Sequence, residues 1–248
     1  MEDKLMLLHG RNVRVYVNGS DISGDLNTVT VQSEQDLNDI TTFGHVGYSN
    51  YPGLGKDSVT MDSIFNTAAR AVAEGLIQNT ASSHGMMIAY GNTSGMPAYA
   101  TGDVSLKSNA MKTVVSDVNR ASMSFETKNF PFENCILLSE GLQAVGVAST
   151  GDGTVVNNGS ASATTGGAAY LQVMSIVSGA LTVHVEASST GAYALEEVTT
   201  CTFAAASSSE TQRIAITSQI AQYARVSWAV TPASTASTAS FVMALKRY

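Results

Sequence analysis

The sequence predicts a mainly β protein: an antiparallel β-sandwich or barrel with one flanking α-helix, followed by a C-terminal β-sandwich or barrel region. Several short segments alternate apolar and polar residues with the period of two that is typical of a half-buried antiparallel strand. Turn residues such as Asn18-Gly19 and Ser178-Gly179 separate these segments. Only residues 66–77 combine an Asn-Thr cap with apolar residues at helical spacing, which predicts a single helix.

The first half of the chain begins with a predicted strand over residues 11–17, which ends at Asn18-Gly19 and is expected to pair with a strand over 27–32. Residues 33–57 are rich in Asn, Asp, Gly and Tyr and show no clear element. A stretch of this length without an element is uncommon in a compact domain and indicates a working loop. Further strands are predicted over residues 58–65, 86–90, 99–106 and 120–127.

A change in composition at residues 149–167 predicts a linker or a long exposed loop, because 5 of these 19 residues are Gly and 7 are Ser or Thr. We therefore expect one domain over residues 1–148 and a second over 168–248. In the second domain, Trp228 belongs to an apolar stripe that is expected to face the core. Its predicted strands are 168–178, 180–187, 198–203, 212–217, 222–231 and 239–246.

Charge limits the classes of function. The chain of 248 residues has 13 Lys and Arg against 20 Asp and Glu, a net charge of −7 and a pI of about 5.0. Such a chain has no basic footprint, which argues against a protein that grips a nucleic-acid backbone. The same acidic balance is compatible with a surface past which DNA slides without binding.

Cysteine content and hydropathy favour a protein that is made and kept in a reducing cytoplasm. Cys135 and Cys201 lie in apolar runs and are expected to be small buried hydrophobic residues rather than a disulfide framework. No signal peptide and no membrane-spanning segment is expected, because no basic stretch precedes an apolar one and no apolar run is long enough.

The sequence offers little material for catalysis. Its four His residues are far apart, and no Gly-x-Ser-x-Gly motif occurs. Residues 53–56 (Gly-Leu-Gly-Lys) lack the further Gly and the Ser or Thr that a phosphate-binding loop requires. The acidic residues after 33 lack the terminal Glu of a calcium loop. We expect no enzyme, no cofactor and no metal site; a hydrolase that uses Asp39 and His45 is the alternative.

Aromatic residues along the 33–57 segment indicate an interface. Phe43, Tyr48 and Tyr51 are spaced along it beside several Gly residues. Large apolar rings on a long loop need burial, and docking on a neighbouring copy supplies it. The alternative is a loop that folds back on its own domain.

The order of several short motifs, most specifically within residues 12–65, resembles the tail tube (major tail) proteins of tailed bacteriophages. The predicted helix after Phe65 is also in the place expected for that family. Residues 169–173 and 222–228 are similar to the β-rich second half of phage virion proteins of this type. The motifs are Val15–Gly24 (VYVNGSDISG), Asn27–Val31 (NTVTV), Asp39–Gly44 (DITTFG), Tyr51–Leu54 (YPGL) and Ser58–Phe65 (SVTMDSIF).

The resemblance implies a tail-tube-like fold that assembles into rings, usually hexameric, which stack into a hollow tube. It implies that the 33–57 loop reaches the adjacent ring and that DNA passes transiently through an acidic lumen during ejection. The expected inter-ring contact residues are Asp39, Thr42, Phe43, Tyr48, Tyr51 and Leu54. The candidate lumen-facing acidic residues are Glu34, Asp36, Asp57 and Asp62.

The expected function is therefore that of a structural virion protein, synthesised in the cytoplasm of a bacterial host and located in the phage tail. Its expected partners are further copies of itself and other tail proteins, without a membrane. The alternative is a capsid decoration or surface-adhesion protein of a phage virion. The C-terminal region either decorates the outside of the tube or forms part of its wall.

Overall fold

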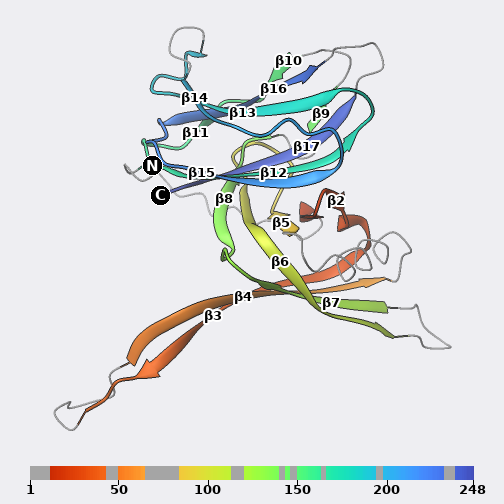
Figure 1. Cartoon of the computed structure of the whole chain (residues 1–248), viewed down its shortest axis with the longest axis vertical. Helices are drawn as coiled ribbons and strands as arrows, with labels where there is room; N and C mark the ends of the chain where they lie inside the picture. Colours follow the sequence, from red (N-terminus) through yellow and green to blue (C-terminus); the bar gives the residue numbers. More distant parts are fainter. Residues whose placement is uncertain are drawn as a thin grey trace. The chain divides into compact units, whose positions relative to one another are not determined.

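A computed structural model describes residues 12–42, 50–64, 84–112, 120–139, 143–145, 150–162, 166–193, 198–231 and 238–248 (Figure 1). The chain forms two compact units, and each draws on separate stretches of the sequence. Unit 1 comprises Met1–Gly24, His84–Gly102 and Glu133–Tyr248, and unit 2 comprises Asp25–Ser83 and Asp103–Phe132. The predicted helix over residues 66–77 lies outside the described residues.

Unit 1 is built almost entirely from strands, and most of the strands predicted from sequence are confirmed within it. Strand β6 (Pro97–Lys112) begins in unit 1 and continues into unit 2. The strands of the first half that lie wholly in unit 1 are β1 (Arg14–Val17), β2 (Ser20–Asp21), β5 (His84–Ala89), β8 (Glu133–Leu137) and β9 (Gln143–Val145). Those that follow are β10 (Thr150–Asp152), β11 (Val156–Asn157), β12 (Gly167–Ile176), β13 (Ala180–Ser188), β14 (Val198–Thr202), β15 (Glu210–Ile216), β16 (Tyr223–Thr231) and β17 (Ala239–Arg247).

The Asn18-Gly19 turn is confirmed, but the partner predicted for its first strand is wrong. Asn18 and Gly19 have φ angles of 47° and 74°, the left-handed conformations that a tight hairpin turn requires. The turn joins β1 to the two-residue strand β2, and the other edge of β1 pairs with β5. Residues 27–32 pair elsewhere, because the hairpin partner lies directly after the turn and period-two alternation alone does not specify which strands pair.

Two antiparallel sheets of unit 1 pack face to face. One has the strand order β10-β16-β13-β14, with β11 also paired to β16, and the other runs β15-β12-β17-β8-β6-β5-β1-β2. A shared hydrophobic cluster contains Val183 of β13, Leu171 of β12 and the predicted core residue Trp228 of β16. The Trp228 ring meets Phe241 of β17 edge-on, with 5.6 Å between ring centroids. The predicted mainly β fold is confirmed with two antiparallel sheets, whereas the sheets within the described residues are open and do not close into a barrel.

Strands β12 and β17 are buried on both faces. Their second face packs in a cluster that joins Tyr170 and Val242 to Tyr16, Met87 and Leu137 from the first half of the sequence. The core of unit 1 therefore contains residues from both predicted domains. The predicted linker at 149–167 contains β10 and β11, which pair with β16. The separate folding of residues 1–148 and 168–248 stays a prediction.

A cluster of polar side chains around Glu133 in unit 1 is held together by hydrogen bonds within the cluster. The Glu133 carboxylate accepts hydrogen bonds from the hydroxyls of Tyr170 and Tyr248. Arg213 lies 3.8 Å from the same carboxylate, and its Nε donates to the Tyr170 hydroxyl at 3.1 Å. Burial raises the pKa of the Tyr170 hydroxyl, so that this group stays protonated at neutral pH.

Both cysteines are free thiols. Cys135 is buried, as predicted, whereas Cys201 is half-buried on β14. Burial raises the pKa of Cys201 to about 12 and raises that of Cys135 as well. Neither group is therefore a thiolate at neutral pH.

Among the described residues, no helix is long and apolar enough to cross a membrane.

Candidate assembly surface

Unit 2 contains a four-stranded antiparallel sheet in the order β3-β4-β7-β6. Strands β3 (Leu26–Asp39) and β4 (Asn50–Ile64) form its longest pair. Strand β7 (Arg120–Thr127) pairs with β4 only over residues 58–64, and residues 104–112 of β6 complete the sheet on the other side of β7. Residues 33–39 and 50–57 therefore pair only with each other and extend past the end of β7 (Figure 1). We call these two segments the β3–β4 ribbon.

The ribbon corrects the prediction that residues 33–57 lack regular structure. Residues 33–39 continue β3 and residues 50–57 begin β4, with a bulge between Gln35 and Leu37. The strand signal was absent because alternation arises only where one face of a strand is buried, and most described side chains of this ribbon are exposed. Residues 43–49, which include Phe43 and Tyr48, lie outside the described residues.

Three large apolar side chains are exposed on and beside the ribbon. Leu37 is 63% exposed, Tyr51 is 64% exposed, and Ile40, just after β3, is 48% exposed. Tyr51 pairs with Asn38, and Leu37 pairs with Pro52, so Leu37 and Tyr51 both lie at the far end of the ribbon but point to its two opposite faces. Sequence reasoning found Tyr51 but missed Leu37 and Ile40, although each is an isolated aliphatic residue in an otherwise polar run.

A polar turn ends strand β3 beside these residues. The Asp39 carboxylate accepts a hydrogen bond from the Thr41 backbone N–H at 2.8 Å. Hydrogen bonds from the side chain and backbone of Thr41 lower the pKa of Asp39, so its negative charge persists to lower pH. Thr42 is exposed, and the side chain of Leu54 is not described.

The four acidic residues predicted to face a lumen occupy different environments. Glu34 and Asp36 are exposed on the ribbon, and Asp62 is exposed on β4. Asp57 is only 6% exposed, and its carboxylate accepts the Phe132 N–H at 2.6 Å. Asp57 therefore points into the protein. The sequence contained a signal for this, because Asp57 has the same period-two position as the buried residues Val59 and Met61.

One face of the unit 2 sheet is apolar and the other is polar. Val59 and Met61 of β4 and Met123 and Phe125 of β7 are buried, and the residues between them point to the opposite face. Cross-strand rows on that face join β3, β4 and β7 through hydroxyl-bearing side chains. These residues are Thr28, Thr30, Ser58, Thr60, Ser122 and Ser124.

Glu126 holds two lysines at one end of the polar face. Its carboxylate lies 3.1 Å from the Lys56 ammonium and also contacts Lys107. Hydrogen bonds from Lys107 and then Lys56 lower the pKa of Glu126. The trio links β4, β7 and β6 at the point where the ribbon leaves the sheet, and sequence reasoning did not identify it.

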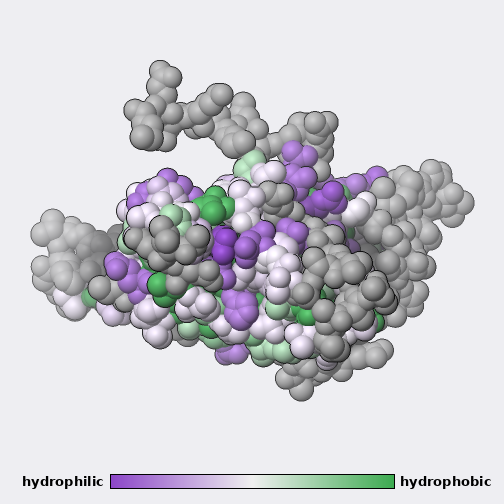
Figure 2. All heavy atoms as spheres, turned by 90° about the horizontal axis from the view of Figure 1, so that it is seen from above, coloured by the Kyte–Doolittle hydropathy of each residue, from purple (hydrophilic) through white to green (hydrophobic). Residues whose placement is uncertain are grey.

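Apolar exposure elsewhere is scattered. On the face seen in Figure 2, hydrophilic and weakly polar residues make up most of the coloured surface, and hydrophobic residues form small separate areas. Isolated apolar residues of this kind are normal on a soluble surface. The ribbon differs because its exposed apolar side chains lie on a two-stranded element with no further strand beside it among the described residues.

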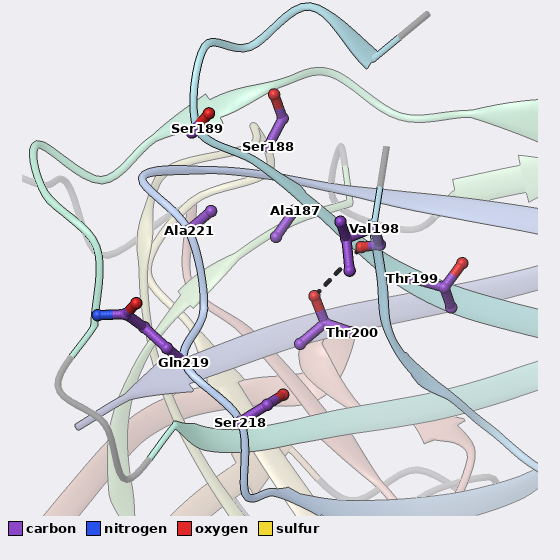
Figure 3. Close-up of a pocket in the computed structure, with 9 residues that line it drawn as sticks. All are labelled: Ala187, Ser188, Ser189, Val198, Thr199, Thr200, Ser218, Gln219 and Ala221. Atoms are coloured by element: carbon purple, nitrogen blue, oxygen red, sulfur yellow. Dashed lines mark hydrogen bonds between the residues drawn. The ribbon is translucent and has the colours of Figure 1, made fainter. Parts of the chain in front are cut away.

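A pocket of about 440 Å³ in unit 1 lies between the end of β13, strand β14 and the segment before β16 (Figure 3). The Ser188 hydroxyl accepts the Gly191 N–H at 2.9 Å, and the Thr200 hydroxyl donates to the Val198 carbonyl at 3.4 Å. The lining residues are small, hydroxyl-bearing or apolar, and none of them carries a titratable side chain. The pocket therefore supplies no acid, base or charged anchor. Among the described residues, no group of three or more His, Cys, Asp or Glu side chains is placed to hold a metal ion.

No protein family model matches the chain. No curated protein sequence matches it either.

Solved structures do resemble the chain in fold. A structure of the SPP1 tail tube aligns at 15% identity with a TM-score of 0.42 over 51% of this chain and 78% of its own. A chain from a native gene transfer agent virion aligns at 11% identity and a TM-score of 0.40, over 51% of this chain and 98% of its own. The SPP1 Dit protein, described as a paradigm of hub adsorption apparatus, aligns at 10% identity and a TM-score of 0.35, over 95% of this chain and 99% of its own. The predicted resemblance is confirmed to this extent: solved phage tail tube structures are among those that the chain resembles.

Proposed function

We propose that this chain is a structural, non-catalytic virion protein whose copies assemble into stacked rings that form a tail tube, a conduit for DNA. The observation that carries the proposal is the β3–β4 ribbon, which extends past its sheet and exposes Leu37, Ile40 and Tyr51. The resemblance of residues 12–65 to tail tube proteins supports the same function.

The ribbon is suited to contact a second copy. Two paired strands without a third are marginally stable in water, and exposed apolar side chains on them gain free energy when a partner covers them. Aromatic residues such as Tyr51 are enriched at the centres of protein interfaces. We assign Tyr51, Asp39 and Thr42 to the contact with the next ring, together with Phe43, Tyr48 and Leu54 from the sequence prediction.

The edges of the unit 2 sheet are suited to close a ring. Among the described residues, β3 pairs only with β4, and β6 beyond residue 104 pairs only with β7. Each strand therefore has a second edge whose N–H and C=O groups can pair with another chain. We propose that β3 of one copy lies beside β6 of the next copy around the ring.

The polar face of the same sheet is suited to line a channel. Its hydroxyl groups are uncharged, Asp62 is an exposed carboxylate, and the two lysines on Glu126 are neutralised in part by that carboxylate. Phosphates are repelled by Asp62. We assign Asp62 to the channel, whereas Glu34 and Asp36 belong to the ribbon and Asp57 is buried.

Electron microscopy of the purified protein over a range of concentrations tests the proposal. Rings or hollow tubes with a central channel are the expected result. Thr30→Pro places a proline on β3 and is expected to prevent ring formation by blocking edge pairing. Ser208→Pro, at a solvent-exposed position outside unit 2, is the control and is expected to assemble normally. Uniform particles that never form rings, even with the other tail proteins present, would favour the decoration or adhesion alternative.

A further inference from the structure

A second pocket of unit 1, of about 300 Å³, lies on one face of the paired strands β8 and β17. Ile136 of β8 pairs directly with Leu245 of β17, and both line the pocket. Asn134 and Arg247 lie two residues further along these strands and therefore share the same face. Asn158 and Cys135 complete the lining, so the pocket has an apolar floor and polar donors at its rim.

Arg247 is the charged group of this pocket, and no carboxylate lines it among the described residues. Its guanidinium donates to the Asn158 carbonyl at 3.5 Å and to the Ser160 carbonyl, and it makes no ion pair within the described residues. Burial lowers the pKa of Arg247.

Two hydrogen-bond donors of the pocket are also unused. Nε of Arg247 and Nδ2 of Asn158 are buried without an acceptor within the described residues. Buried donors in folded proteins normally have an acceptor, so this pair indicates a missing one. Both side chains end in rotatable groups, and an anion that enters the pocket can engage these donors once the groups turn toward it.

The β3–β4 ribbon carries the complementary chemistry. Glu34, Asp36 and Asp39 lie on one of its strands, against Lys56 on the other. Glu34 accepts a hydrogen bond from Gln32, and Asp39 accepts one from Thr41. Asp36 has no hydrogen-bond or ion-pair partner among the described residues. The exposed Tyr51 lies on the same face of the ribbon, because it pairs with Asn38, two residues after Asp36.

We propose that the Arg247 pocket of one copy receives the ribbon of a second copy, with the Asp36 carboxylate on Arg247 and the Tyr51 ring against Ile136 and Leu245. A carboxylate and an aromatic ring on one face of the ribbon match a pocket with a guanidinium at its rim and an apolar floor. This assignment rests on the proposed assembly of copies through the ribbon and names the surface that the ribbon contacts.

Charge reversal tests the pair. Asp36→Lys and Arg247→Glu each place like charges together, and each is expected to raise the concentration at which assembly begins by about 10-fold or more. The double variant restores an opposite pair and is expected to return within about 3-fold of the wild type. Lys128→Glu changes the net charge by the same amount as Arg247→Glu at an exposed position that belongs neither to the pocket lining nor to residues 33–39 and 50–57, and it is expected to assemble normally.

A disulfide trap covers the case in which Arg247→Glu does not fold. Tyr51→Cys mixed with Ile136→Cys, each in a Cys135→Ser, Cys201→Ser background, is expected to give a covalent dimer on oxidation, whereas either variant alone gives much less. Absence of the mixed dimer, or equal assembly of all charge variants, overturns the Arg247 pocket as the receptor. Failure of the wild-type protein to assemble under any condition overturns the proposed function instead, so the two failures are distinguishable.

Discussion

Removal of the apolar contacts of the ribbon, by Leu37→Ala with Tyr51→Ala, should prevent assembly while the monomer stays folded. Tyr51 exposes 64% of its surface. An aromatic side chain buries roughly 200 Å², so about 130 Å² is available to a partner, equivalent to about 3 kcal/mol at about 25 cal/mol per Å². Leu37, with 63% exposed, adds about 1–2 kcal/mol on the same basis.

Summed over the surfaces that cover the two faces of the ribbon, these contacts amount to about 4–5 kcal/mol, which is about a thousandfold in an association constant. The same substitutions remove little from the isolated subunit, because exposed side chains usually change its stability by no more than about 0.5 kcal/mol. We therefore expect the onset of assembly, followed by light scattering and electron microscopy, to move beyond the accessible concentration range. Urea unfolding of the monomer should be nearly unchanged.

Val177→Ala is the matched control, because Val177 is 69% exposed but lies outside the ribbon, in the turn between β12 and β13. This variant is expected to assemble as the wild type does. Normal tubes from the Leu37 and Tyr51 double variant would refute the role of the ribbon. An equal loss of assembly in the Val177 variant would show that surface apolarity in general, rather than the ribbon, drives association.

Three further predictions follow from contacts within one copy. Asp57→Ala leaves the buried Phe132 N–H without its acceptor and should lower the free energy of unfolding, measured by urea titration, by about 1–3 kcal/mol. Asp62→Ala, on the exposed face of the same strand, is the control and should change the free energy of unfolding little. Equal effects of the two substitutions would contradict the role assigned to the buried Asp57 carboxylate. The pKa of Glu126 is lowered in the folded state, so the ionised carboxylate stabilises the fold at pH values above its ordinary pKa, and this stabilisation is lost as pH falls through the lowered pKa. The Glu126→Gln variant should lack that part of the dependence of stability on acid. The same profile of unfolding midpoint against pH in variant and wild type would be evidence against this role of Glu126. A fragment of residues 168–248 should lack a cooperative thermal transition, because β12 and β17 lose the residues that cover their second face, and a sharp transition would support the separate domain predicted from sequence.

The second half of the chain was the most predictable part of the fold. All six strands predicted there occur, and Trp228 lies in the core beside Phe241. These strands carry apolar residues on a buried face, and the first two end at segments that contain Gly179 and Gly191, so local sequence specifies them well. The pairing of β12 with β15 and β17 could not be predicted in the same way, because it joins segments that are distant in sequence.

The candidate assembly surface was predictable in location but not in form. Acidic and aromatic residues singled out residues 33–57, and Tyr51 is exposed there as an interface requires. The segment is a paired ribbon rather than an irregular loop, because backbone hydrogen bonds between β3 and β4 form without help from a buried face. The burial of Asp57 could be predicted from the sequence, because it has the same period-two position as Val59. The trio of Glu126, Lys56 and Lys107 could not be predicted, because its members come from three different strands.

The sequence by itself determined the mainly β composition, the position of most strands, the acidic balance and the segment that we propose for assembly. These properties follow from local periodicity, turn residues and counted charges, which do not depend on distant contacts. Only the tertiary structure decided which strands share a sheet, that unit 1 draws its core from both ends of the chain, and that Asn158 approaches Arg247 beside a pocket. Those features arise because apolar faces of different strands pack against one another and exclude water. An apolar strand can be buried in this way against many different partners, so its partner is determined only by the packing of the whole chain.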